Sequence, residues 1–202
     1  MALGYLISKA SAKPLKLDPN VPTILVLSII PDIDILFGID EFHRGPTHSI
    51  VAALLVFIPF FVIYRKKAIP YFIGLVSHAA IGDLIIGGGI ELFWPITNSK
   101  VSLYPLIPKI EITSPVNAVL ETALFIAATI IMYKTRDLHS FFQNKKTNLL
   151  LAIPIATVLL PTFLAYPLEV PLLLIAPHLF YLTLYAISVL IVLTRARRTT
   201  TL

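Results

Sequence analysis

Acidic and histidine side chains gather in four short strings in the first half of the chain. These strings span Pro31–Asp34, His43–Ser49, Ser77–Asp83 and Gly87–Pro95. The chain has no cysteine, so carboxylates and neutral imidazoles form its donor set, which suits Zn²⁺ or another divalent metal such as Mn²⁺. The pattern predicts one divalent metal held by five ligands: Asp32, Asp34, His48, His78 and Asp83.

Three further residues could act on a substrate beside that metal. His43 is predicted as a ligand or as an acid/base, and Glu91 as a general base or as an acid that supports a ligand, with a packing role as its alternative. Arg44 could hold an anionic phosphate through paired hydrogen bonds. Water bound to a divalent metal is acidified and can attack a phosphoester or another ester, so the predicted chemistry is metal-assisted hydrolysis.

Long apolar blocks must position these residues. The sequence is 57% hydrophobic and 13% charged, with a mean hydropathy of +0.87, whereas soluble domains carry about a quarter charged residues. About 20 apolar residues are needed for a helix to cross the bilayer. Apolar blocks cover residues 50–64, 69–93, 115–133, 147–166 and 170–193, and an earlier run, 21–39, is interrupted at Pro31, Asp32 and Asp34.

These blocks predict an all-α, polytopic membrane protein with about six membrane segments, the first broken at Pro31. Without internal repeats or a soluble domain, the chain is expected to form a single helical membrane domain, 1–202. Residues 1–96 would form the metal-site half, and residues 97–202 would add further membrane helices. Met1–Ala12 lacks the long apolar core of a signal peptide, so it is expected to lie on the membrane or in the first helical hairpin.

The distribution of basic residues predicts the orientation. When the connections are assigned alternately to two sides, all but three of the 16 lysines and arginines fall on one side; the exceptions are Arg44, Lys100 and Lys109. The positive-inside rule then predicts a multi-pass protein of the cell membrane with both termini in the cytoplasm. This topology explains the net charge of +5, so no nucleic-acid partner is expected.

The strings together resemble a known family, the membrane-bound metal-dependent hydrolases, also described as LexA-binding, inner-membrane-associated hydrolases (YdjM-like). The resemblance rests on Pro31-Asp32-x-Asp34, His43-Arg44-Gly45-x-Thr47-His48-Ser49, Ser77-His78 with Asp83, and Leu92-Phe93-Trp94-Pro95, and it covers roughly residues 1–96. It implies a multi-helix membrane hydrolase with a looser similarity to zinc-dependent phospholipase C in the order of its Asp and His ligands. It does not identify the substrate.

Two features depart from the family pattern. Members usually carry a histidine just before a Leu-Gly-Tyr-like segment, so either one ligand is absent here or the gene start lies upstream of Met1. The family pair is commonly His-x-x-x-Asp, whereas His78 and Asp83 are five residues apart. On an α-helix this leaves them about 140° apart, so a shared metal requires a bulge or break, which Gly82 permits.

A non-enzymatic reading remains open. The Asp/His cluster could be structural, in a membrane scaffold or an ion-coupled transporter, although transporters often show paired internal repeats. Asp32, Asp34, His78 and Asp83 would still need partners, because ionisable groups within a membrane are costly. His178, beside Pro177 in the last block, is expected to bond a neighbouring carbonyl. The preferred prediction is a hydrolase acting on a lipid or lipid-linked substrate from a site near the outer leaflet.

Overall fold

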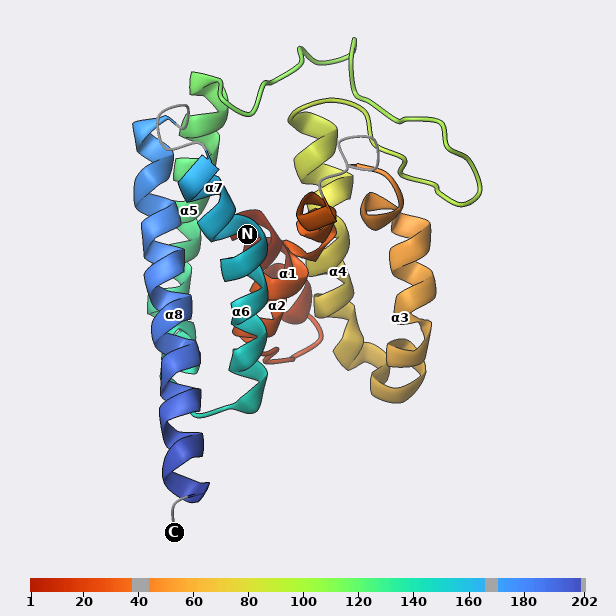
Figure 1. Cartoon of the computed structure of the whole chain (residues 1–202). Helices are drawn as coiled ribbons and strands as arrows, with labels where there is room; N and C mark the ends of the chain where they lie inside the picture. Colours follow the sequence, from red (N-terminus) through yellow and green to blue (C-terminus); the bar gives the residue numbers. More distant parts are fainter. Residues whose placement is uncertain (38–43, 166–170, 201–202) are drawn as a thin grey trace.

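The computed structural model describes residues 1–37, 44–165 and 171–200, and this part of the chain is helical without β-strands (Figure 1). The first half contains α1 (Ala2–Ala12), α2 (Val21–Leu27), α3 (Ile50–Tyr64) and α4 (Ile69–Ser77). Short helical segments join or extend them: 3₁₀ helices Ile30–Phe37, Pro46–His48 and Arg65–Ala68, and a π-helix, His78–Asp83.

The second half is built around three longer helical stretches. These are α5 (Pro115–Lys134), a composite stretch, and α8 (Leu172–Thr200). The composite stretch consists of a 3₁₀ helix (Lys146–Leu151), α6 (Ala152–Pro154), a π-helix (Ile155–Leu159) and α7 (Leu160–Ala165), and another 3₁₀ helix, Asp137–Phe142, follows α5. The all-helical prediction is confirmed.

Local sequence explains several of the helix starts. Asn20, Ser49 and Ser114 each accept a backbone N–H with their side chains at the start of α2, α3 and α5, respectively. Such caps satisfy amide groups that would otherwise lack partners at a helix N-terminus. The break predicted at Pro31 is also present, because α2 ends at Leu27 and Pro31 lies in the following 3₁₀ helix.

Within the described residues, three helical stretches are long and apolar enough to cross a membrane: Pro115–Lys134, Lys146–Leu164 and Leu172–Ala196. They agree with the last three predicted blocks. In the first half, α3 coincides with the predicted block 50–64, and more than half the surface of its Leu55, Val56, Val62 and Ile63 is exposed. Apolar side chains exposed over most of a helix are typical of a lipid-facing segment.

The predicted block 69–93 is too long for one helix. The chain leaves the helix before Gly87 and then runs in an extended turn, with isolated backbone bridges between Ile86 and Ile110 and between Ile90 and Val101. Gly87 and Gly88 have φ angles of +85° and +123°, which side-chain-bearing residues rarely adopt. Hydropathy alone could not show this end, because the residues around the glycines remain apolar.

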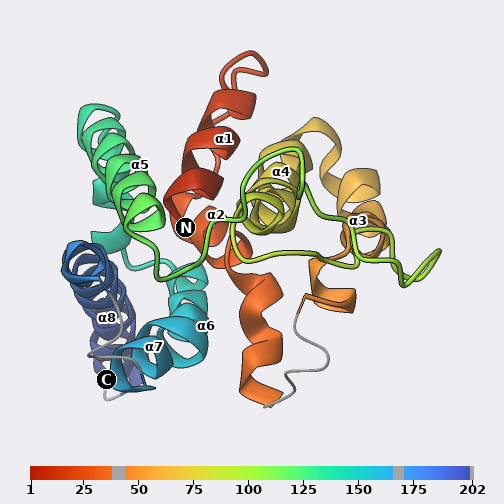
Figure 2. The ribbon, with the colours of Figure 1, turned by 90° about the horizontal axis from the view of Figure 1, so that it is seen from above.

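α1 and α2 form an antiparallel hairpin at the centre of the molecule, between α4 and α5 (Figure 2). Its residues Tyr5 and Leu25 are fully buried and share one core with Met132 and Tyr185 of the second half. Of the two positions predicted for Met1–Ala12, the hairpin is therefore the one observed. The central hairpin joins the two halves of the chain through a common core.

Most of the basic connections lie toward one end of the molecule. The connections α1–α2, α3–α4 and α5–α6 and the C-terminus lie toward the lower end of Figure 1, while the stretch 96–114 crosses the upper end. Met1 lies inside the fold and lines a cavity described below. The clustering of basic connections agrees with the sequence-based grouping.

Candidate metal centre

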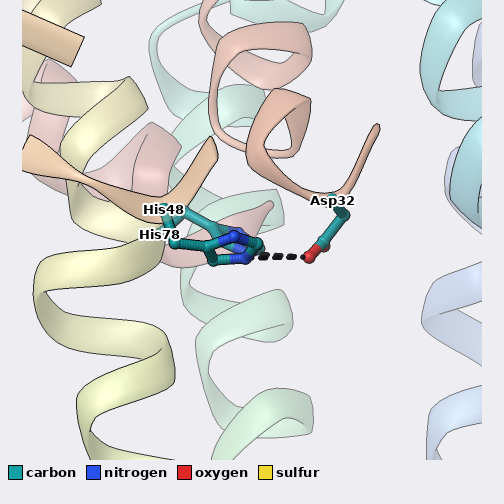
Figure 3. Close-up of side chains that lie close together, drawn as sticks. All are labelled: Asp32, His48 and His78. Atoms are coloured by element: carbon teal, nitrogen blue, oxygen red, sulfur yellow. Dashed lines mark hydrogen bonds and ion pairs between the residues drawn. The ribbon is translucent and has the colours of Figure 1, made fainter. Parts of the chain in front are cut away.

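Three separate segments bring Asp32, His48 and His78 together (Figure 3). Asp32 lies in the 3₁₀ helix after α2, His48 ends the 3₁₀ helix before α3, and His78 begins the π-helix after α4. Asp32 Oδ1 is 3.1 Å from His78 Nε2 and 3.4 Å from His48 Nε2. His48 is almost fully buried, with 1% of its surface exposed.

Asp83 joins this group from the other end of the π-helix. Its Oδ2 atom lies 3.2 Å from His48 Nε2 and 3.3 Å from His78 Nε2. A π-helix pairs each residue with the one five positions along, so it stacks His78 and Asp83 on one face. The predicted departure from α-helical geometry is confirmed. The π-helix places His78 and Asp83 on the same face although they are five residues apart.

Asp32, His48 and His78 offer ligand atoms that all lie within 4.8 Å of one another, close enough to hold one small metal ion, and Asp83 lies against both histidines. Ligand atoms arranged tetrahedrally around Zn²⁺ at its usual bond lengths lie about 3.4 Å from one another. The four contacts that link Asp32, His48, His78 and Asp83 measure 3.1 to 3.4 Å. Two imidazole nitrogens and two carboxylate oxygens also suit this ion chemically.

The other ring nitrogen of each histidine has a partner of its own. His78 Nδ1 lies 3.0 Å from the carbonyl oxygen of Ser28, to which it can donate. His48 Nδ1 lies 3.5 Å from Asp34 Oδ2 and 3.0 Å from the Thr47 hydroxyl. Such partners fix the orientation of each ring, so that Nε2 is the nitrogen that a metal can bind.

Asp34 therefore lies on the far side of His48 from the four convergent atoms. Its Oδ2 atom accepts a hydrogen bond of 2.7 Å from the Thr47 hydroxyl, and only 6% of its surface is exposed. In this position its carboxylate orients His48. Direct ligation by Asp34 stays a prediction.

The acidic surroundings change the protonation of His48. Burial disfavours its charged form, but hydrogen bonds with Asp32 and Asp34 and the charge of Asp83 outweigh this and raise the pKa of His48 to about 9. In the metal-free protein, a protonated His48 therefore balances part of the carboxylate charge. A metal ion must displace that proton to bind Nε2.

Arg44 approaches the cluster from a strained turn, with a φ of +67°. Its Nη2 atom donates to the Ile86 carbonyl at 3.1 Å and lies 3.7 Å from Asp83 Oδ1. Its Nη1 atom is buried and has no hydrogen-bond partner among the described residues. A Cβ atom at Gly87 would collide with this guanidinium, so the glycine makes room for Arg44 as well as permitting the turn.

The remaining predicted residues are less directly placed. His43 lies outside the described residues. The backbone N–H of Glu91 donates to the Arg44 carbonyl at 2.9 Å. Glu91 is not among the described residues that line the cavity beside the cluster. Its catalytic role stays a prediction. His178 Nδ1 lies 2.9 Å from the Leu174 carbonyl, as expected from its place beside Pro177.

Sequence reasoning missed the contributions of Thr47 and Ser28. Thr47 belongs to the string His43–Ser49, so its place beside a candidate ligand was a usable signal. Ser28 acts through its backbone carbonyl, which no residue type reveals.

A cavity of about 380 Å³ opens beside the cluster and extends to the second half of the chain. Asp32, His78 and Asp83 line it from one half, and Glu121, His178 and Tyr181 line it from α5 and α8. A substrate could therefore reach the candidate metal centre and contact both halves of the molecule.

Comparison with known proteins identifies a relationship over nearly the whole chain. The model of a family described as YdjM inner membrane protein matches residues 1–195. Searches of curated proteins and of solved structures each gave no match. The match extends well beyond the region 1–96 on which the sequence resemblance rested.

Proposed function

The chain belongs to the YdjM inner membrane protein family, and from its Asp/His cluster we propose that it is an integral membrane hydrolase dependent on a divalent metal. The proposed substrate is a phosphoester or another ester in a lipid or lipid-linked molecule. The observation that carries this proposal is the convergence of Asp32, His48 and His78, whose ligand atoms all lie within 4.8 Å of one another, with Asp83 beside both histidines; such a donor set suits Zn²⁺. Mn²⁺ is the alternative ion.

Four residues would hold the metal: Asp32, His48, His78 and Asp83. Asp34 and the Ser28 carbonyl would orient the two imidazoles. A divalent metal at such a site supplies a nucleophilic water at neutral pH and polarises the scissile oxygen. His43, next to Arg44 in the chain, would act as an acid/base.

Arg44 would bind the anionic part of the substrate. Its Nη2 atom is held by the Ile86 carbonyl and faces Asp83, whereas Nη1 is buried without a hydrogen-bond partner in the described chain. A guanidinium fixed on one side can donate from the other side to a phosphoryl oxygen. This favours a phosphoester over a neutral ester.

The proposed topology has six membrane passes, with the basic connections and the C-terminus in the cytoplasm. The segments that carry Asp32 and His48 lie nearer the opposite end, in the upper half of Figure 1. The positive-inside rule supports this orientation. The cavity would then be reached from the outer leaflet.

A structural role for the cluster is supported by one observation. Protonated His48 lies within 3.2 to 3.5 Å of Asp32, Asp34 and Asp83, so the cluster can neutralise much of its own charge without a metal. A membrane scaffold is therefore the second candidate function. Measurements of metal content and of hydrolysis together distinguish the hydrolase from the scaffold.

The proposal is tested with detergent-purified protein that is stripped by a chelator and then supplied with Zn²⁺ or Mn²⁺. Release of phosphate or alcohol from a panel of phospholipids and prenyl phosphates should return with one of these ions. Arg44→Ala should keep the metal and lose turnover of anionic substrates, while Arg195→Ala, altered in the basic C-terminal part of α8, should match the parent. Stoichiometric metal without hydrolysis of any phosphoester or ester would contradict the proposed activity.

A further inference from the structure

The cavity beside the cluster is lined by buried polar residues that take no part in the proposed metal site. Asn117 on α5 and Tyr181 on α8 both line it, and each has only 4% of its surface exposed. Neither Asn117 Oδ1 nor Tyr181 Oη has a hydrogen-bond partner in the described part of the chain. Buried polar atoms in native proteins nearly always have a partner, so these two point to a group that enters the cavity.

The chemical role of Asn117 is fixed by its other contact. Its Nδ2 atom donates to the Ile112 carbonyl at 2.6 Å, which identifies the remaining atom, Oδ1, as the oxygen. This oxygen can only accept a hydrogen bond. The group that fills this part of the cavity must therefore donate one.

The position of the Tyr181 hydroxyl is set by aromatic packing. Its ring meets Phe125 edge-on at a centroid distance of 5.7 Å, and Tyr185 lies at 5.7 Å on another side. The ring therefore has little freedom to turn its hydroxyl toward another part of the protein. The same cavity also receives His178, whose Nδ1 is committed to the Leu174 carbonyl, so Nε2 remains as an acceptor.

The rest of the lining contains one arginine, three carboxylates (Asp32, Asp83 and Glu121) and an apolar wall. Arg44, with its unpartnered Nη1 atom, lines the cavity on the side of the metal cluster. Leu3, Ile29 and Leu174 are among the apolar residues of the wall. The volume of about 380 Å³ lies in the range of small-molecule sites, about 300 to 1,000 Å³, and holds a headgroup and the first part of an apolar chain.

We propose that this cavity selects a phosphorylated amphiphile that carries a free hydroxyl group near its phosphate, with Asn117 and Tyr181 recognising that hydroxyl. Asn117 Oδ1 offers an acceptor and the Tyr181 hydroxyl offers a donor to that hydroxyl, while Arg44 binds the phosphate. The assignment of the phosphate rests on the proposed function. The second half of the chain thus determines specificity for a site whose metal ligands all come from the first half.

Two probes that are identical apart from one hydroxyl test this proposal: the decyl ether form of lysophosphatidic acid, which carries a glycerol hydroxyl, and its deoxy analogue 3-decyloxypropyl phosphate, which does not. Their binding to the full chain in detergent is measured with a chelator present, so that no hydrolysis is required. The parent should bind the lysophosphatidic acid about 3- to 10-fold more tightly, as expected for loss of one neutral hydrogen bond. Tyr181→Phe should reduce this preference and leave the affinity for the deoxy analogue unchanged.

Controls separate recognition from folding. Tyr181→Phe removes a hydroxyl without a described partner, so it should not lower the melting temperature, and Tyr133→Phe, an exposed tyrosine on α5, should retain the full preference. Asn117→Leu tests the acceptor but also breaks the bond to Ile112, so its effect is read against its melting temperature. Equal affinities of the parent for the two probes, or an unchanged preference in Tyr181→Phe, would overturn the proposal.

The outcome is distinct from that of the hydrolase test. A preference that depends on Tyr181, in a protein that binds no metal, would support the cavity assignment while removing the proposed activity. Metal-dependent hydrolysis with equal affinity for both probes would do the reverse.

Discussion

At the residue scale, the cluster shows why paired donors were informative in the sequence. Asp32, His48 and the pair His78 and Asp83 come from three separate segments of the chain, and their polar atoms converge within 3.1 to 3.4 Å along four contacts. Intramembrane ionisable groups must find partners, which made their selection possible. Whether an acid meets Nε2 or Nδ1 of a histidine depends on side-chain geometry, so sequence could not separate Asp34 from Asp32.

The pH dependence of metal binding follows from the state of His48. Its pKa is about 9 in the metal-free fold, above the usual value of about 6.5. The protonated imidazole therefore contributes stability that is present below the lower value and lost as pH rises through the higher one. Metal affinity should move in the opposite direction, rising between pH 7 and 9 as the competing proton leaves.

Calorimetric titration of Zn²⁺ in buffers of different ionisation enthalpy measures this proton release directly. Release of a proton at pH 7.5 that disappears above pH 9 is expected. An affinity that does not change over this range would show that His48 is not a ligand.

At the element scale, the π-helix His78–Asp83 allows His78 and Asp83 to face the same site although their spacing does not suit an α-helix. The family resemblance includes a His-x-x-x-Asp spacing, which places both side chains on one face of an α-helix. Here one additional residue separates them, and the π-turn absorbs it. The sequence predicted the need for an irregular turn from this spacing, but the end of the helix before Gly87 was hidden by continuous apolar residues.

Changing the length of this turn should therefore have opposite effects in the two directions. Deletion of Ile81, which is partly exposed, should convert the π-turn to an α-turn and retain metal binding. Insertion of an alanine between Ile81 and Gly82 should separate His78 from Asp83 and lower the metal content. Metal analysis and circular dichroism of both variants decide this, and an insertion variant with the parent's metal content would refute the role of the π-turn.

At the scale of the whole molecule, hydropathy located the second-half helices well because each must bury its backbone hydrogen bonds along a continuous apolar segment. Pro115–Lys134, Lys146–Leu164 and Leu172–Ala196 agree closely with the predicted blocks. The cavity between the halves could not be found in this way, since Asn117 and Tyr181 stand alone within apolar sequence. Only the packing of α5 and α8 beside the cluster brings them to the site.

The orientation in the membrane is open to a direct test because the chain has no native cysteine. Single cysteines at Ser99, in the stretch 96–114, and at Asn144, in the α5–α6 connection, should react with a membrane-impermeant maleimide from opposite sides. We expect Ser99→Cys to be labelled in intact cells and Asn144→Cys only after permeabilisation. Labelling of both in intact cells, or the reverse pattern, would contradict the proposed topology.

The most direct test of the account is the metal content of the purified, full-length protein and of its ligand variants. We expect about one equivalent of Zn²⁺ or Mn²⁺ in the parent, from one tetrahedral site, and its loss in Asp32→Ala, His78→Ala and Asp83→Ala. Asp34→Ala should bind about 10- to 100-fold more weakly, as for other residues that orient a ligand, while the exposed His139→Ala should match the parent. A folded parent without metal, or parental metal content in both Asp32→Ala and His78→Ala, would contradict the shared-ion site.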